Sequence, residues 1–172
     1  MTATESSGGL IVVGVDGSDS SIDALHWAAA QAKRTGSALR VMATWAYPSS
    51  LGWAPSWPED WDPQKETENA LTKVIEDALG SDPGIEVSQL VVEGHAAQVL
   101  VKASEDADLM VVGSRGHGAF TGMLLGSVSE YLATHCRCPV LIVHYKDKDH
   151  GDSQTGDDHR TGVTKAGGGS AR

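Results

Sequence analysis

Residues 108–130 read DLMVVGSRGHGAFTGMLLGSVSE, and they are the most informative part of this sequence. The apolar run from Leu109 to Val112 predicts a short buried strand. Five glycines follow the run. We expect Ser127 to cap a helix, because Glu130 stands three residues further on, as in a capping box. The stretch therefore predicts a strand, a glycine-rich loop and the start of a helix.

A glycine-rich loop that leads into a helix is suited to anion binding. Glycines let the backbone adopt unusual conformations and approach a ligand closely. The first amides of a helix have no intrahelical partner, and the helix dipole adds partial positive charge there. Phosphate is the common occupant of such a place. The alternative is a surface loop that is rich in glycine and binds nothing.

Two well-known phosphate-binding loops do not fit the stretch. A P-loop requires a lysine directly before the serine or threonine that opens the helix, and Gly126 stands there instead. The dinucleotide fingerprint belongs after the first strand of its unit, whereas this loop follows a late strand and lacks the third glycine at the required spacing.

The bulk composition is typical of one globular domain. The chain has 172 residues, of which 40% are hydrophobic and 21% charged, enough to bury a core. A net charge of −10 argues against binding to nucleic acid or to an anionic membrane surface. The first residues lack a signal-peptide pattern, no apolar run is long enough to cross a bilayer, and two cysteines suggest no disulfide framework. We expect a cytoplasmic protein.

The remaining sequence predicts an alternation of strands and helices. We expect strands at residues 10–15, 38–45, 109–112 and 139–144, and alternation predicts a further strand at 85–93. Helical spacing predicts helices at 20–35, capped by Ser20 with Asp23, from Asp62-Pro63 to Gly80, from Gly94 onward, and at 128–135. This alternation indicates an α/β sandwich with a parallel sheet. We expect one domain over 10–145, a disordered N-terminus over 1–9 and a disordered tail over 146–172, which is almost without apolar residues.

Asp16 is a candidate binding residue because it follows the first strand. Ligands of α/β sheets bind at the carboxyl ends of the strands, and Gly14 inside that strand indicates a close approach of backbone or ligand. Asp16 is equally well explained as a turn residue. Residues 47–61 contain three prolines and three tryptophans. One interpretation of this segment is a lid or a surface for a partner protein. The interpretation that we favour is a loop anchored to the domain by its own tryptophans.

Other reactive residues give weaker signals. The histidines show no ligand spacing for a metal. Cys136 and Cys138 could form a redox-active or metal-binding pair. We favour the interpretation that they are ordinary buried thiols. Arg115 and His117 lie in the glycine loop and point either to phosphate oxygens or to solvent. No nucleophile with a paired base is visible, so we expect no enzyme.

The spacing G-x2-G-x9-G-[ST], made by Gly113, Gly116, Gly126 and Ser127, resembles the ATP-binding signature of the universal stress protein family. The resemblance extends over residues 10–144. It also rests on the segments VVGVDGS at 12–18, VVGSRGH at 111–117, GSVS at 126–129 and CPVLIV at 138–143.

The resemblance implies a doubly wound sheet of five mainly parallel strands in the order 3-2-1-4-5, with helices on both faces. It implies a nucleotide between strands one and four, and a homodimer, for which we expect the last strand to form the interface. Asp16 would lie near the ribose and Mg²⁺, the backbone of Thr44 near the adenine, and the glycine loop around ribose and phosphates. The full candidate set is Gly14, Asp16, Thr44, Gly113, Ser114, Arg115, Gly116, His117, Gly126, Ser127, Val128 and Ser129.

The function implied is that of an ATP-binding regulator of a stress response, a binding module without efficient catalysis. Two alternatives use the same fold. One is a slow ATPase or self-phosphorylating enzyme with the same pocket, and the other is a flavodoxin-like FMN carrier.

Overall fold

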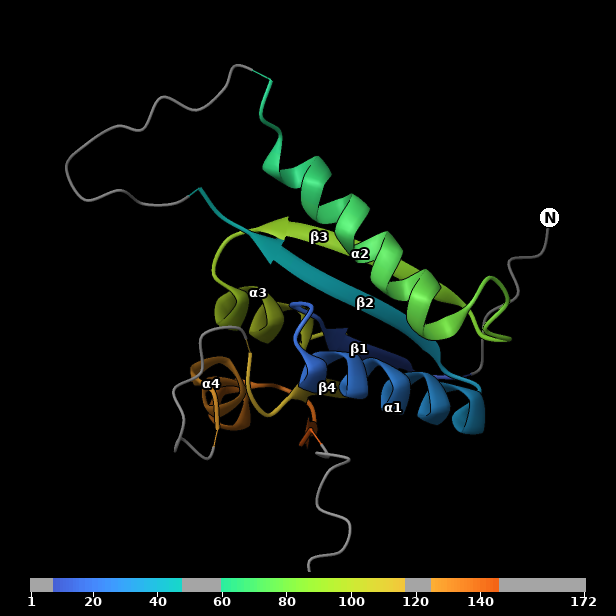
Figure 1. Cartoon of the computed structure of the whole chain (residues 1–172). Helices are drawn as coiled ribbons and strands as arrows, with labels where there is room; N and C mark the ends of the chain where they lie inside the picture. Colours follow the sequence, from blue (N-terminus) through green and yellow to red (C-terminus); the bar gives the residue numbers. More distant parts are fainter. Residues whose placement is uncertain (1–7, 48–59, 117–124, 146–172) are drawn as a thin grey trace, which may run out of the picture.

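The computed structural model describes residues 8–47, 60–116 and 125–145. Within them five strands alternate with four helices (Figure 1). In chain order these are β1 Leu10–Gly14, α1 Asp19–Thr35, β2 Ala38–Trp45, α2 Pro63–Leu79, β3 Val87–Glu93, α3 Ala96–Ala103, β4 Leu109–Gly113, α4 Ser127–His135 and β5 Val140–Val143. The expectations for residues 1–7, for His117, for the tail and for most of the Trp-rich segment lie outside the described residues.

The strands form one parallel sheet in the order β3-β2-β1-β4-β5, as expected. β1 lies at its centre, where Val12 is opposite Arg40 of β2 on one side and Met110 of β4 on the other. β3 and β5 are the two edges. The prediction of an α/β fold with this strand order is therefore confirmed.

Alternate residues of the central strands enter two separate cores. Val13 and Val111 pack under α1 and α2, and Val12 and Met110 pack under α3 and α4. All four side chains are fully buried. Burial on both faces explains why these strands are continuous apolar runs without alternation in the sequence. Figure 1 shows α1 and α2 along one side of the sheet, with α3 and α4 grouped apart from them.

The start of α2 was predicted correctly. Asp62 is the N-cap, and its side chain accepts a hydrogen bond of 3.0 Å from the backbone N–H of Lys65. Pro63 occupies the first helical position, where its missing N–H costs nothing. Among the described residues no helix has the length and apolarity needed to cross a membrane.

The predicted starts of α1 and α3 were wrong. α1 begins at Asp19 with Ser18 as its N-cap. Ser20 does not cap it, because its hydroxyl donates to the carbonyl of Arg115 instead. α3 begins at Ala96 and not at Gly94, because Gly94 has a φ of 138°, which is incompatible with a helix and suits glycine alone.

The predicted capping of α4 was also wrong. Gly126 is the N-cap and Ser127 is the first helical residue, with no side-chain cap. The backbone N–H of Gly126 donates to the carbonyl of Ser114 at 2.7 Å. This bond fixes Gly126 in an extended conformation at the helix entrance, so Ser127 already lies inside the helix.

Three strands are shorter than predicted. β1 ends at Gly14, β3 begins at Val87 and β5 runs from Val140 to Val143. Single inter-strand bonds continue past two of these ends: the N–H of Val15 donates to the carbonyl of Met42, and the carbonyl of Pro139 accepts from the N–H of Met110. The first residue pair of β3 is Val87 with Leu39.

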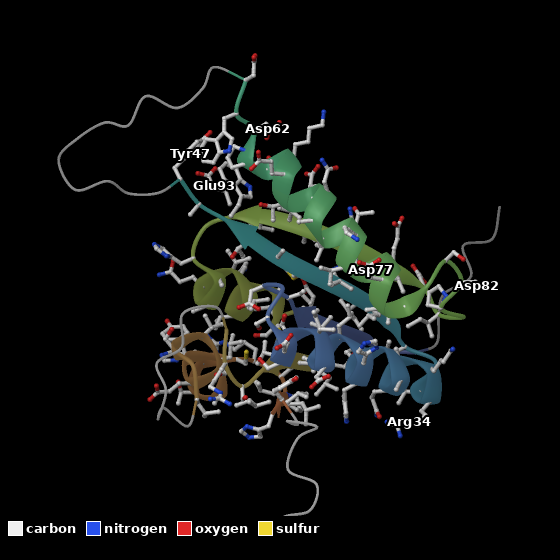
Figure 2. The ribbon with its side chains drawn as sticks, in the orientation of Figure 1. Arg34, Tyr47, Asp62, Asp77, Asp82 and Glu93 are labelled. Carbon is white, nitrogen blue, oxygen red and sulfur yellow. The ribbon has the colours of Figure 1, made fainter. Side chains whose placement is uncertain are left out.

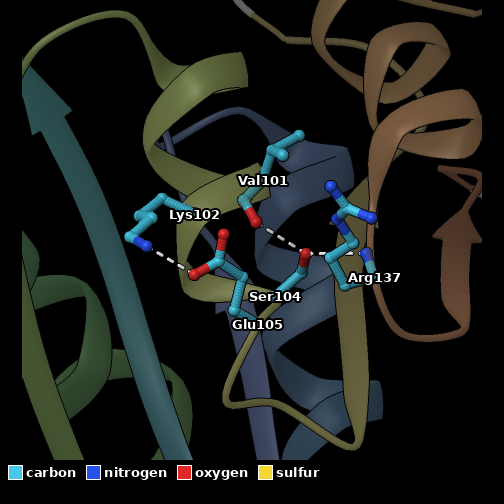
Figure 3. A network of polar contacts seen from close by, with 5 residues as sticks. All are labelled: Val101, Lys102, Ser104, Glu105 and Arg137. Atoms are coloured by element: carbon cyan, nitrogen blue, oxygen red, sulfur yellow. Dashed lines mark hydrogen bonds and ion pairs between the residues drawn. The ribbon is translucent and has the colours of Figure 1, made fainter.

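A buried serine joins the end of α3 to the segment before β5 (Figure 3). The Ser104 hydroxyl donates to the carbonyl of Val101 at 2.6 Å and accepts from the backbone N–H of Arg137 at 2.9 Å. Beside it Lys102 pairs with Glu105. Cys136 and Cys138 flank Arg137 and pack against the core between the sheet and α3 and α4. Their burial raises the pKa of both thiols.

Candidate functional site

A pocket of about 570 Å³ opens at the carboxyl ends of β1, β2 and β4. β1 pairs with β2 on one side and β4 on the other, and the following helices lie on opposite faces of the sheet. Doubly wound sheets place ligands at such a switch point. Most of the candidate residues line the pocket: Gly14, Asp16, Thr44, Gly113, Arg115, Gly116, Gly126, Ser127, Val128 and Ser129.

Two candidates are placed differently. Ser114 does not line the pocket but is buried, and its hydroxyl has no hydrogen-bond partner among the described residues. Its backbone carbonyl holds the ends of the loop together by accepting from the Gly126 N–H and from the Ser129 hydroxyl at 3.0 Å. His117 lies outside the described residues.

The entrance of α4 presents to this pocket three amides that have no partner within the helix. The first i→i−4 bond of the helix runs from the N–H of Glu130 to the carbonyl of Gly126. The amides of Ser127, Val128 and Ser129 precede it and therefore have no intrahelical partner. All three residues line the pocket. The arrangement suits an anion held by backbone N–H groups.

The three glycines of the signature have different surroundings. A Cβ on Gly113 would lie 2.7 Å from the backbone of Ser20, so this glycine allows α1 to pack on β4. A Cβ on Gly116 would collide with the carboxylate of Asp16. A Cβ on Gly126 would meet its nearest atom at 3.4 Å, in ordinary contact. Protein packing alone therefore requires a glycine at 113 but not at 126.

The turn after β1 is fastened to the glycine loop. The hydroxyl of Ser20 donates to the carbonyl of Arg115, and the hydroxyl oxygen of Ser18 lies 3.3 Å from the same carbonyl. Ser18 donates to Asp16 Oδ1, through its N–H at 3.0 Å and its hydroxyl at 2.5 Å. These bonds place the Asp16 carboxylate against Gly116, at the pocket wall.

The other half of the pocket is apolar, and we did not predict it. Met42 and Ala43 of β2 form part of it, and α2 adds Thr67, Ala70, Leu71 and Val74. The helical spacing of Leu71 and Val74 indicated a buried face. Nothing in that spacing shows that the face extends beyond the sheet to the pocket. The other unpredicted lining residues are Val15, Gly17, Ser21, Ala96, Leu100 and Val112.

The charged groups at the pocket are few. Of the described residues that line it, Asp16 is the one carboxylate and Arg115 the one cation. The described residues contain no cluster of three metal-ligating side chains. A Mg²⁺ ion that arrives with a nucleotide needs only one or two carboxylates, because phosphates and water complete its shell. Asp16 fits that requirement.

The chain matches known proteins over this whole domain. The model of the universal stress protein family matches residues 10–144. A universal stress protein of Mycobacterium tuberculosis is 35% identical over 147 residues, covering 80% of this chain and 48% of that protein. One of Mycolicibacterium smegmatis is 36% identical over 136 residues, covering 77% and 45%.

A solved structure shares both fold and sequence features. It is a universal stress protein in complex with cAMP, 28% identical, with a TM-score of 0.59, and the match covers 82% of this chain and 100% of that chain. The chain spans about half the length of the curated relatives that it matches. The family match over residues 10–144 and the identity to these relatives show that the chain belongs to the universal stress protein family.

Proposed function

We propose that this chain binds an adenine nucleotide, ATP with Mg²⁺, in the pocket at the switch point, and acts as a nucleotide-sensing module in a stress response. The observation that carries the proposal is the meeting, in one pocket, of the α4 amides, the glycine loop, Asp16 and Thr44. The pocket volume of about 570 Å³ lies within the usual range for small-molecule sites. The cAMP bound to a related universal stress protein supports an adenine ligand.

Each half of the pocket matches one part of the ligand. The apolar lining from Met42, Leu71 and Val74 suits the purine ring, and the backbone of Thr44 offers it polar groups. The unpaired amides at α4 suit the phosphates. Asp16 suits the ribose or a Mg²⁺ ion. A chain of net charge −10 must hold phosphates by such local groups, because its overall field repels them.

The residues that line the pocket favour nucleotide binding over catalysis. A single carboxylate and a single cation line the described pocket, and no base stands beside a nucleophile there. The described lining contains no aromatic ring to stack on a flavin, which favours an adenine nucleotide over FMN.

Calorimetric titration with Mg-ATP tests the proposal, with Asp16→Asn and Asp82→Asn as matched variants. Asp82 carries the same charge at the opposite end of the sheet (Figure 2). We expect the wild type and Asp82→Asn to bind alike, and Asp16→Asn to bind more weakly and with less dependence on Mg²⁺. A parallel phosphate-release assay distinguishes the slow ATPase. Absence of heat with ATP, AMP and cAMP in the wild type would contradict the proposed function.

A further inference from the structure

A second pocket, of about 370 Å³, lies between the end of β2 and the start of α2. It shares no lining residue with the first pocket. Its lining includes the aromatic rings of Trp45, Tyr47 and Trp61 and the carboxylates of Asp60 and Asp62. Figure 2 shows Tyr47 and Asp62 together at this end of the molecule. We call this site the aromatic pocket.

Within the aromatic pocket, the ring of Tyr47 makes edge-to-face contacts with both tryptophans. The ring centroids of Trp45 and Tyr47 are 5.1 Å apart with an interplanar angle of 79°. Those of Tyr47 and Trp61 are 6.1 Å apart at 71°. The three rings therefore form one aromatic cluster at the pocket, with Tyr47 between the two tryptophans. Tyr47 remains 55% exposed, so its ring is accessible from solvent.

The walls are held in place by the protein itself. The indole N–H of Trp61 donates to Glu66 Oε2 at 3.2 Å. Asp62 is fixed by its cap on α2, and the carbonyl of Trp45 accepts from the N–H of Gly94 at 2.8 Å. The side chains of Trp61 and Asp62 are therefore held in place before a ligand arrives, which reduces the entropic cost of binding.

The charge around the aromatic pocket is negative. Residues 60–66 carry the carboxylates of Asp60, Asp62 and Glu66 against the single ammonium of Lys65. The α2 dipole adds about half a positive charge at this end, which the carboxylates outweigh. The ion pairs that the structure shows in the described ranges, Lys73–Asp77 and Lys102–Glu105, lie elsewhere. The pocket is thus suited to a cation and unsuited to an anion.

We propose that the aromatic pocket binds a quaternary ammonium group, such as that of choline. Its methyl groups spread the positive charge over an apolar surface and carry no hydrogen-bond donors, so π faces can replace its water. Asp60 and Asp62 add attraction at the rim. A primary ammonium loses stronger hydration on entering such a site, and a neutral alcohol of the same shape gains no cation–π attraction. The site is independent of the proposed nucleotide pocket.

The first test compares choline with dimethylbutanol, its uncharged carbon isostere, on the full chain. We expect choline to bind with a dissociation constant on the order of a millimolar, and its methyl proton resonances to shift upfield from the ring currents. Dimethylbutanol should bind at least about threefold more weakly. Saturating Mg-ATP should leave choline binding unchanged. Equal binding of the two compounds, or no binding of choline, would overturn the proposal.

Matched variants locate the site. Tyr47→Leu keeps apolar volume but removes a π face, and Asp62→Asn keeps a good N-cap while it removes the charge. Each should weaken choline binding roughly three- to tenfold. The controls are Tyr131→Leu, an exposed ring on α4, and Asp77→Asn at the far end of α2, which should leave it unchanged. If Tyr47→Leu and Asp62→Asn, shown to be folded by circular dichroism, bind choline like the wild type, the aromatic pocket is not the site.

Discussion

At the scale of single residues, the glycines of one motif serve different purposes. Gly113 is needed because the backbone of α1 passes 2.7 Å from where its Cβ would be. Gly126 has room for a Cβ at 3.4 Å from its nearest neighbour, and its backbone angles suit any residue. Gly126 also lines the pocket, so we attribute the glycine there to ligand approach and not to packing.

This difference predicts opposite effects of two alanine substitutions. Gly113→Ala should lower the free energy of unfolding by about 1–3 kcal/mol, because it forces α1 away from β4. Gly126→Ala should change stability by less than about 1 kcal/mol but weaken Mg-ATP binding roughly tenfold or more, since it obstructs the charge-assisted bonds to the α4 amides. Urea unfolding and calorimetry on both variants measure the two effects. Equal stability of the two variants would refute the assignment of Gly113 to packing.

The thiols give a prediction with a defined sign. Burial raises the pKa of Cys136 and of Cys138, so a smaller fraction of each is thiolate at pH 8 than in an unfolded chain. Alkylation by iodoacetamide should be slower in the folded protein, and its rate should continue to rise with pH beyond the pKa of an ordinary thiol. Mass spectrometry of each single Cys→Ser variant follows the remaining thiol. If the thiols of the folded protein were alkylated at pH 8 as fast as those of the protein unfolded in guanidinium, the raised pKa would be contradicted.

At the scale of elements, the contact between the β1–α1 turn and the glycine loop is the decisive one. Ser20 is 4% exposed, and its hydroxyl bonds the carbonyl of Arg115. Ser20→Ala should cost about 0.5–1.5 kcal/mol of stability and should weaken ATP binding, because the loop is held less firmly beside Asp16. Ser37→Ala is the matched control, since the Ser37 hydroxyl bonds only the neighbouring Thr35 side chain in the described region. Denaturant unfolding and calorimetry report both effects, and a loss of stability equal to that of the control would contradict this role.

The elements themselves were largely predictable, and their starts were not. Apolar runs identified the central strands, because strands buried on both faces need apolar residues throughout. The edge strand β3, with exposed polar residues, was identified by its alternation instead. Helix starts failed at Ser20 and Ser127, where a serine suggested capping. Ser127 lines the pocket, and the Ser20 hydroxyl bonds a carbonyl 95 residues away in the sequence. No local pattern reveals such a contact.

The site was half predictable for a similar reason. Residues after β1 and β4 were identified, because the ends of parallel strands must meet at one edge. The contribution of α2 was missed, because its apolar face is continuous from the core to the pocket. Leu71 is 3% exposed and belongs to both. Which part of such a face meets a ligand depends on how far the helix extends past the sheet, and that is a tertiary property.

At the scale of the whole molecule, the sheet has two edges of different character. β3 carries polar residues such as Ser88 and Gln89, both exposed, whereas β5 reads VLIV without a charge. An apolar edge strand with unpaired backbone groups invites pairing with another chain. A symmetric pairing of β5 with its twin closes that edge and leaves no further strand to add.

We therefore predict a homodimer through β5. Leu141→Lys or Val143→Lys should give monomers or insoluble protein, because each would place a charge in the interface, where an unpaired ion is strongly disfavoured, and both side chains also pack against the core. Ser88→Lys puts the same charge on the other edge and should leave the dimer intact. Light scattering gives the mass of each variant, and circular dichroism shows that it remains folded. Dimers of unchanged mass in both β5 variants, or dissociation by Ser88→Lys alone, would place the interface elsewhere. A monomeric wild type would contradict the predicted dimer, and β5 would then be protected only by its short length of four residues.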